Sequence, residues 1–174
     1  MKRSVDAFDY ASHICKAMKK GILLTTKVGE EVNTMTIGWG HIGIEWSRPV
    51  FVAYVRESRH TKSMLDESAE FTVNIPMDEV NSKILGHCGT KSGRDTNKIL
   101  DLGLTLEAGE NVSVPGIREL PLTIECKVIF KHEQDESVLP PDIYARYYPS
   151  TEANPGGDYH TAYYGQIVGA YIIE

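Results

Sequence analysis

The chain has 174 residues, of which 41% are apolar and 24% charged, which is typical of one globular domain that buries its own core. Its net charge of −6 argues against nucleic acid or an anionic membrane as the main partner. We find no apolar run of the roughly 20 residues that a membrane span needs, and no signal peptide. Three scattered cysteines, Cys15, Cys88 and Cys126, favour free thiols in a reducing cytoplasm.

The first part of the chain predicts one helix and then strands. We expect an N-terminal helix within residues 1–20, because apolar side chains recur at helical spacing over residues 5–20 and lysines precede Gly21. The side chains predicted to face the core are Ala11, Ile14, Cys15 and Met18. The β-type runs that follow are Ile22–Lys27, Asn33–Ile37, Val50–Val55 and Phe71–Ile75.

Residues Gly38–Gly43 spell G-x-G-x-x-G, the spacing of a Rossmann nucleotide site. That motif binds a pyrophosphate only where a helix starts at its third glycine. Here Pro49 follows too soon for a helix, and the bulky Trp39 lies where the backbone would have to approach a ligand. The glycines therefore favour a sharply bent strand or loop with a close backbone approach.

Two short helices are predicted in the middle of the chain. Ser58 is a plausible N-cap for a helix over Thr61–Ser68. Asp78 is a plausible cap for a second helix over Glu79–Cys88. Its buried face would carry Val80, Ile84 and Cys88, and Gly86 and Gly89 would help to end it.

The last third of the chain predicts more strands around one irregular segment. Thr123–Lys131 alternates, with Ile124, Cys126, Val128 and Phe130 on one face and Glu125 on the other. Gln134–Gly157 carries four prolines and predicts an irregular loop, and Tyr163–Ile173 is β-rich again. At least six strands with three short helices indicate a largely antiparallel barrel with helices at its edges.

Two basic turns stand out against the acidic background. In the first, Arg56, Arg59 and Lys62 accompany Ser58 and Thr61 at a predicted helix start, a combination that suits a phosphate monoester. The alternative is a solvated loop with capping side chains. The second turn, with Lys91, Ser92, Arg94 and Lys98, leads into a short helix and has the same two interpretations.

Five motifs in register resemble those of the flavin reductase-like family of small FMN-binding proteins, which includes the flavoredoxins. Together they cover most of residues 21–173 in the right order. They are NxMTxGW at Asn33–Trp39, RxSRHT at Arg56–Thr61, EFTVNIP at Glu70–Pro76, GTKSGRDxxK at Gly89–Lys98 and HTxxxGxIV at His160–Val168.

The resemblance implies a mainly β (α+β) fold, an FMN-binding split barrel with short peripheral helices that fills residues 1–174 as a single domain and pairs as a homodimer. It implies a cytoplasmic oxidoreductase that takes hydride from NAD(P)H onto FMN and passes electrons to flavin, oxygen or a redox protein. The alternative is a flavoredoxin-type electron-transfer protein that carries flavin without oxidising NAD(P)H directly.

The resemblance also implies roles for individual residues. Ser58, Arg59 and Thr61 would hold the FMN phosphate beside Arg56, and Ser92 and Lys98 would contact the flavin or its tail, with either Lys91 or Lys98 pointing inward. Asn33, Met35, Thr36 and Trp39 would lie along the flavin ring, although Met35 and Trp39 are also ordinary core residues.

His160 is either an exposed loop histidine or, as the resemblance implies, the residue at the open face of the flavin where a reductant docks. Hydride transfer itself needs no acid or base, because the flavin carries that chemistry. No metal site is expected, since His87-Cys88 lacks the second half of a zinc pattern.

Overall fold

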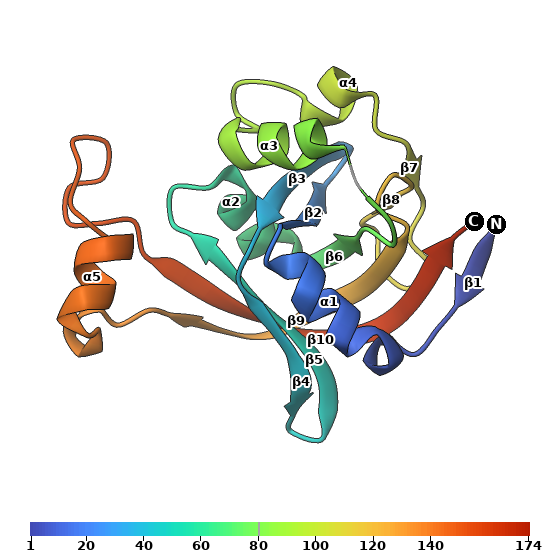
Figure 1. The fold of residues 1–174 in the computed structure, drawn as a ribbon, viewed down its shortest axis with the longest axis horizontal. Coiled ribbons are helices and arrows are strands. Elements are labelled where there is room, and N and C mark those ends of the chain that lie inside the picture. The colour runs from blue at the N-terminus through green and yellow to red at the C-terminus, as the bar shows by residue number, and fades with distance from the viewer. Residues whose placement is uncertain (80) are drawn as a thin grey trace.

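The computed structural model describes residues 1–79 and 81–174, and its central feature is one curled antiparallel sheet of eight strands (Figure 1). The sheet order is β3-β2-β6-β9-β10-β5-β4, with β1 added beside β10. Because the edge strands β3 and β4 follow each other in the chain, the sheet curls toward closure as a split barrel, as the sequence predicted. The strands of this sheet are β1 (Lys2–Ser4), β2 (Ile22–Val28), β3 (Glu31–Ile37), β4 (Gly40–Glu45), β5 (Arg48–Arg56), β6 (Glu70–Ile75), β9 (Leu122–Glu133) and β10 (His160–Ile173).

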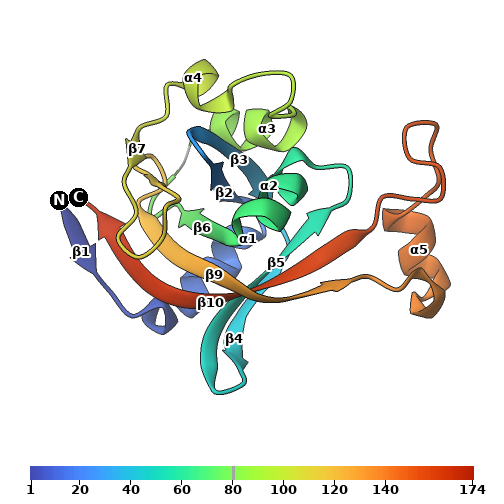
Figure 2. The same ribbon diagram turned by 180° about the vertical axis from the view of Figure 1, so that it is seen from behind.

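The two longest strands, β9 and β10, form a twisted ribbon through the whole molecule (Figures 1 and 2). One half of the ribbon lies in the barrel, and the other half extends as an arm to a peripheral helix, α5 (Pro141–Tyr147). Their register shifts between Tyr164 and Gly165 and again between Ile167 and Gly169, which bends the ribbon. Gly165 is required at the first bend, because a Cβ there would overlap the ring of Phe71.

Helices cover the barrel and bury apolar faces against it. Helix α1 (Ala11–Met18) buries Ile14 and Met18 in the main core, and α2 (His60–Ser68) adds Leu65. Helices α3 (Ser82–Thr90) and α4 (Lys98–Leu102) form a second cluster over β2 through Ile84 and Ile99. A two-stranded sheet of β7 (Leu106–Glu107) and β8 (Gly116–Ile117) completes the fold.

The N-terminal helix is shorter than predicted. A 3-10 turn over Ala7–Tyr10, capped by Asp6, precedes α1, and Cys15 is exposed on α1 instead of lying on its buried face. Cys15 follows Ile14, whose side chain fills the contact with the sheet, so the adjacent position points toward solvent.

Two predicted caps are wrong. The N-cap of α2 is Arg59, since the hydroxyl of Ser58 binds a carboxylate elsewhere in the chain. Helix α3 begins at Ser82, where Asn81 Oδ1 accepts the N–H of Lys83, so Asp78 does not cap it. Gly86 lies inside α3, away from its end, whereas Gly89 is the penultimate residue of the helix. The predicted role of Val80 lies outside the described residues.

Two segments in the last third also differ from the prediction. The proline-rich stretch contains α5 and a 3-10 turn over Glu136–Val138, because Pro141 occupies the first helical position, where a proline needs no N–H. In β9, Glu125 is fully buried although its alternation predicted an outward side chain. Its carboxylate accepts the backbone N–H of Asn111 at 2.9 Å, so a covering loop buries it.

Among residues 1–79 and 81–174, none of the helices is both long and apolar enough to span a membrane. The same residues contain no cluster of three or more His, Cys, Asp or Glu side chains that could hold a metal ion.

Candidate functional site

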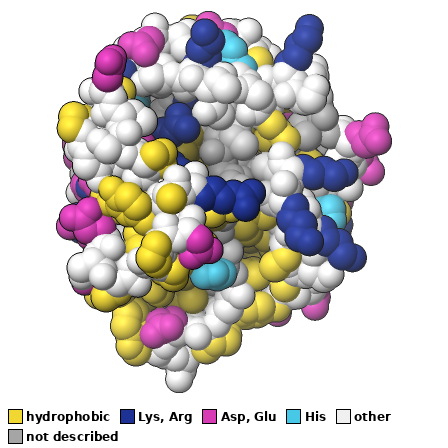
Figure 3. Space-filling view, turned by 60° about the vertical axis from the view of Figure 1, so that its left-hand side comes forward, with side chains coloured by type: hydrophobic (Ala, Val, Ile, Leu, Met, Phe, Trp, Pro, Cys, Tyr) yellow, Lys and Arg dark blue, Asp and Glu magenta, His cyan; other side chains and the backbone are white. Residues whose placement is uncertain are grey.

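Strand β3, the start of α2 and the turn before α4 enclose a groove on one side of the barrel. The groove has three connected parts, which share lining residues: a basic pocket of about 340 Å³, a neck of about 150 Å³ and an aromatic chamber of about 500 Å³. Met35 and Arg59 line both the basic pocket and the neck, and Trp39 and Tyr54 line both the neck and the chamber. The face seen in Figure 3 is hollowed, with Lys and Arg side chains bordering the hollow.

The basic pocket holds cations that have no anionic partner. Lys98, at the first position of α4, is only 4% exposed. Among the described residues no hydrogen bond or ion pair satisfies its ammonium or the guanidinium of Arg59. Burial lowers the pKa of Lys98. The neighbouring Cys88 opposes this shift, and the nearby charge of Arg59 adds to it to a smaller extent. A buried lysine beside a half-buried arginine favours an anion from outside the chain.

Hydroxyl and backbone groups complete the pocket at the start of α2. Thr61 is buried there and its Oγ1 accepts Asn33 Nδ2–H at 2.9 Å, so its own proton can be donated to a ligand. The positive end of the α2 dipole adds to the potential. Gly93 closes the pocket opposite, because its backbone packs so closely on Asn33 that a Cβ would overlap Oδ1.

Ser58 and Arg56 are hydrogen-bonded to other parts of the chain and are not free to bind a phosphate in this structure. The backbone N–H and the hydroxyl of Ser58 donate to the carboxylate of Asp158 at 2.9 and 2.7 Å. Arg56 Nη1 donates to the carbonyl oxygen of Asp158 at 2.7 Å, and Nη2 to that of Tyr147 at 3.1 Å. Arg56 therefore ties the segment around α5 to the barrel.

Aromatic rings line the neck. The rings of Trp39 and His160 lie 5.0 Å apart, and Tyr147 meets Trp39 edge-on at 5.2 Å. His160, at the first position of β10, is buried, and its Nδ1 is hydrogen-bonded to Tyr148 Oη at 2.9 Å. Burial, followed by the charge of Arg56, lowers the pKa of His160 to about 4, so the imidazole is neutral near pH 7.

Residues 17–174 match the family model described as flavin reductase like domain. The chain belongs to this family. Two uncharacterized archaeal proteins are similar to it: one from Archaeoglobus fulgidus, 34% identical over 63% of this chain and 61% of its own length, and one from Pyrococcus abyssi, 28% identical over 78% and 76%. The match to the first thus spans less than two thirds of that relative.

Solved structures of flavoproteins have the same fold. The flavoredoxin of Desulfovibrio vulgaris (Miyazaki F) aligns over 88% of this chain and 69% of its own, with 24% identity and a TM-score of 0.65. An FMN-binding domain of a flavin reductase-like enzyme from Shewanella baltica covers 99% and 77%, with 16% identity and a TM-score of 0.65. The NADH:FAD oxidoreductase of Streptomyces globisporus covers 98% and 87%, with 16% identity and a TM-score of 0.63. At these identities the likeness shows the fold alone.

In this flavin reductase-like chain, every residue predicted from the sequence to contact a cofactor lies on the basic pocket or the neck. Lys91 and Lys98 both line the basic pocket, but Lys91 is exposed and Lys98 is buried. The basic pocket is lined by Asn33, Met35, Ser58, Arg59, Thr61, Ser92 and Lys98, and the neck by Met35, Thr36, Trp39, Arg56, Arg59 and His160. Their roles toward a flavin stay predictions.

Several residues of the groove escaped the sequence analysis. Tyr54 was counted within an apolar strand, and the alternation of β5 could have marked it as the side chain facing the groove. Gly93 stood inside the second basic turn, where a glycine indicates a close backbone approach. Tyr148 lies within the proline-rich segment and Asp158 directly follows it. Their partners, 12 and 100 positions away, are too distant in sequence to leave a local signal.

The groove fits FMN by its chemistry. A phosphate monoester supplies the dianion that the enclosed Lys98 and Arg59 lack. The neck and chamber offer flat apolar walls for a ring. Strand β3, at the edge of the sheet, pairs with β2 on one side only, so backbone groups on its other side can meet polar edges of a ligand.

Proposed function

We propose that this protein binds FMN in the groove and acts as a flavin-dependent oxidoreductase. The observation that carries the proposal is the buried Lys98, whose ammonium has no hydrogen-bond or ion-pair partner among the described residues. It lies in the basic pocket, which shares Met35 and Arg59 with the aromatic neck. In this arrangement Lys98, Arg59 and Thr61 bind the phosphate. Met35, Thr36 and Trp39 line the path of the ring along β3. Bound FMN supplies reversible uptake of hydride or single electrons.

The residues of the neck act mainly by shape and by excluding water. His160 is a neutral imidazole near pH 7, because its pKa is about 4, so it is not an imidazolium acid there. Its role is therefore that of a neutral wall, held in place by Tyr148 and packed against Trp39. This differs from a general acid, whose pKa would have to lie near the working pH.

The aromatic chamber is the proposed site of the second reactant. It lies beyond Trp39 and Tyr54, is lined by His41 and Tyr148, and has the cationic side chain of Lys19 at its wall. Rings and a cation suit the nicotinamide and phosphates of NAD(P)H, which we take as the electron donor. Flavin, oxygen or a redox protein would then accept the electrons.

The alternative is a flavoredoxin-type carrier that accepts electrons from a protein and does not oxidise NAD(P)H. Rapid mixing of the purified flavoprotein with NADH and with NADPH distinguishes the two. Bleaching of the flavin band on the time scale of turnover supports the reductase. Bleaching by dithionite alone supports the carrier.

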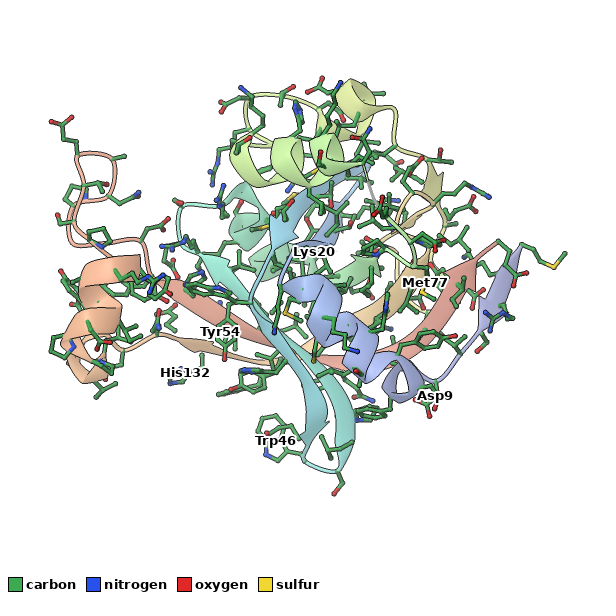
Figure 4. All side chains as sticks on the ribbon, in the orientation of Figure 1. Asp9, Lys20, Trp46, Tyr54, Met77 and His132 are labelled. Carbon is green, nitrogen blue, oxygen red and sulfur yellow. The ribbon has the colours of Figure 1, made fainter. Side chains whose placement is uncertain are left out.

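We further propose that two copies of this chain associate through the β4–β5 hairpin and the neighbouring arm. Ile44 and Trp46 at the hairpin are 63% and 59% exposed, and Phe130 on the arm is 41% exposed. Trp46, at the end of the hairpin in Figure 4, packs edge-on against Phe130 at 5.7 Å. Exposed aromatic clusters of this kind are typical of interfaces. Analytical ultracentrifugation of the wild type and of Trp46→Ser tests this interface: the wild type should sediment as a dimer and the variant as a monomer. A wild type that sediments as a monomer would contradict the proposal.

We also propose that the protein works in the reducing cytoplasm. The three cysteines support this location, because all are free thiols in the structure.

The phosphate assignment has a direct test. The double variant Arg59→Ala/Thr61→Ala should weaken FMN binding by about 3–6 kcal/mol, at ~1.5–3 kcal/mol for each charge-assisted hydrogen bond. Arg3→Ala, which removes an exposed arginine on β1, is the control and should leave the affinity unchanged. Released flavin is identified by its absorption spectrum. A folded double variant with wild-type FMN affinity would rule out the assignment.

A further inference from the structure

The carboxylate of Asp158 occupies the donors of Ser58, which lines the basic pocket and which the family resemblance assigns to the FMN phosphate. It accepts the N–H of Ser58 through Oδ1 at 2.9 Å and the hydroxyl of Ser58 through Oδ2 at 2.7 Å. Two carboxylate oxygens on one N–H and one hydroxyl stand in for two oxygens of a phosphate, since both groups are anionic acceptors. The inference below rests on the proposed function for this corner.

A glycine turn delivers Asp158 to Ser58. Gly156 and Gly157 have φ values of +94° and +106°, which side chains larger than hydrogen rarely adopt. A Cβ on Gly157 would also lie 2.8 Å from the carbonyl oxygen of Tyr148. The chain can therefore reverse only with glycine here, and the reversal brings the carboxylate back to the start of α2.

The same segment carries the aromatic wall of the neck. Arg56 donates to the carbonyl oxygens of both Asp158 and Tyr147, and Tyr147 contacts Trp39. Tyr148 is hydrogen-bonded to His160. The contact of Asp158 with Ser58 and the position of this wall are thus parts of one set of ties between the α5 segment and the barrel.

We propose that Asp158 is an internal competitor for the phosphate: it satisfies Ser58 in the flavin-free protein and is displaced when FMN binds. A dianionic phosphate and a carboxylate repel each other when they share the same donors, so both cannot stay on Ser58. Displacement removes one tie of the α5 segment, which couples occupancy of the basic pocket to the aromatic wall. The apparent affinity for FMN is reduced by the fraction of molecules in which Asp158 is in place.

The direction in which one substitution changes the FMN affinity tests the proposal. Asp158→Asn keeps the size of the side chain but removes its charge, and FMN titrated into the flavin-free full chain should bind at least about threefold more tightly, because the competing state is less populated. Asp142→Asn, which removes the same charge from an exposed position on α5, should bind as the wild type does. A purely structural Asp158 predicts weaker binding, and weaker or unchanged binding overturns the proposal.

Proteolysis gives a second readout that does not need flavin. Arg146 on α5 is exposed, so trypsin cleavage after it reports how firmly the segment is held. Inorganic phosphate should speed this cleavage in the wild type and leave Asp158→Asn, already cleaved faster, unaffected. If the wild type binds no FMN, the proposed function fails while this readout still tests Asp158. If the rate of cleavage is the same in both proteins and does not change with phosphate, Asp158 does not compete with phosphate for Ser58.

Discussion

The burial of a neutral His160 makes the stability of the flavin-free protein depend on pH in a predictable way. In the folded chain the pKa of His160 is about 4, because burial and the charge of Arg56 disfavour the imidazolium. In the unfolded chain it returns to about 6.5. Between these two values the unfolded state binds a proton that the folded state does not, so stability falls as the pH falls.

The magnitude follows from the same two values. Each pH unit over which only the unfolded chain is protonated costs about 1.4 kcal/mol. Acidification from about pH 7 to about pH 5 protonates His160 in the unfolded chain but hardly in the folded one. The free energy of unfolding should therefore fall by about 2 kcal/mol through this residue. For a chain of this size the same loss lowers the melting temperature by about 4–8 °C.

The assay compares urea unfolding of wild type and His160→Gln at the two pH values, followed by tryptophan fluorescence. Glutamine does not titrate, and all other acidic and basic groups are common to both proteins, so the difference between the two pH dependences isolates His160. The wild type should lose about 2 kcal/mol more than the variant on acidification. Equal losses would show that the imidazole titrates normally and is not sealed within the neck.

Three further outcomes follow from the groove and the barrel. Lys98→Met should weaken FMN binding about 10- to 100-fold, measured by titration, because it removes one charge-assisted contact. It should not lower the free energy of unfolding in urea, because the buried ammonium has no partner among the described residues. Gly93→Ala should lower the FMN affinity and the melting temperature, because the new Cβ would overlap Asn33 Oδ1. As its control, Gly86→Ala in α3 places a Cβ with no atom within 4 Å and should stabilise the protein by about 0.5–1 kcal/mol. Glu125→Gln should cost about 1–3 kcal/mol of stability, measured in urea, because it disturbs the acceptors of the loop N–H groups; an unchanged midpoint would contradict that role.

Local patterns predicted the strands and the site where short-range chemistry decides the structure. The β-type run before Gly38 and the apolar run of β5 specify strands whatever they pack against. Arg59 and Thr61 lie at a helix start, so both reach the basic pocket without help from distant residues. The ammonium of Lys62 instead pairs with Glu57 and Asp66.

The prediction failed where a distant partner decides. Ser58 is a residue type that often caps helices, yet its hydroxyl donates to Asp158, a hundred positions away, and the N-cap of α2 is Arg59 instead. Glu125 has the alternation of an outward residue, yet a loop covers it with N–H donors. In each case a charged acceptor outweighs the local preference, because hydrogen bonds to ionised groups are stronger than those to neutral groups.

The sequence by itself determined the family, the antiparallel strands, and the set of cations and hydroxyls that a phosphate needs, because these depend on residue type and on spacing within a few positions. Only the tertiary structure decided that Lys98 rather than Lys91 is enclosed, that His160 is a buried neutral ring, and that Asp158 lies on Ser58. Burial and charge neighbours are properties of the folded surface, and residues far apart in the chain supply them together.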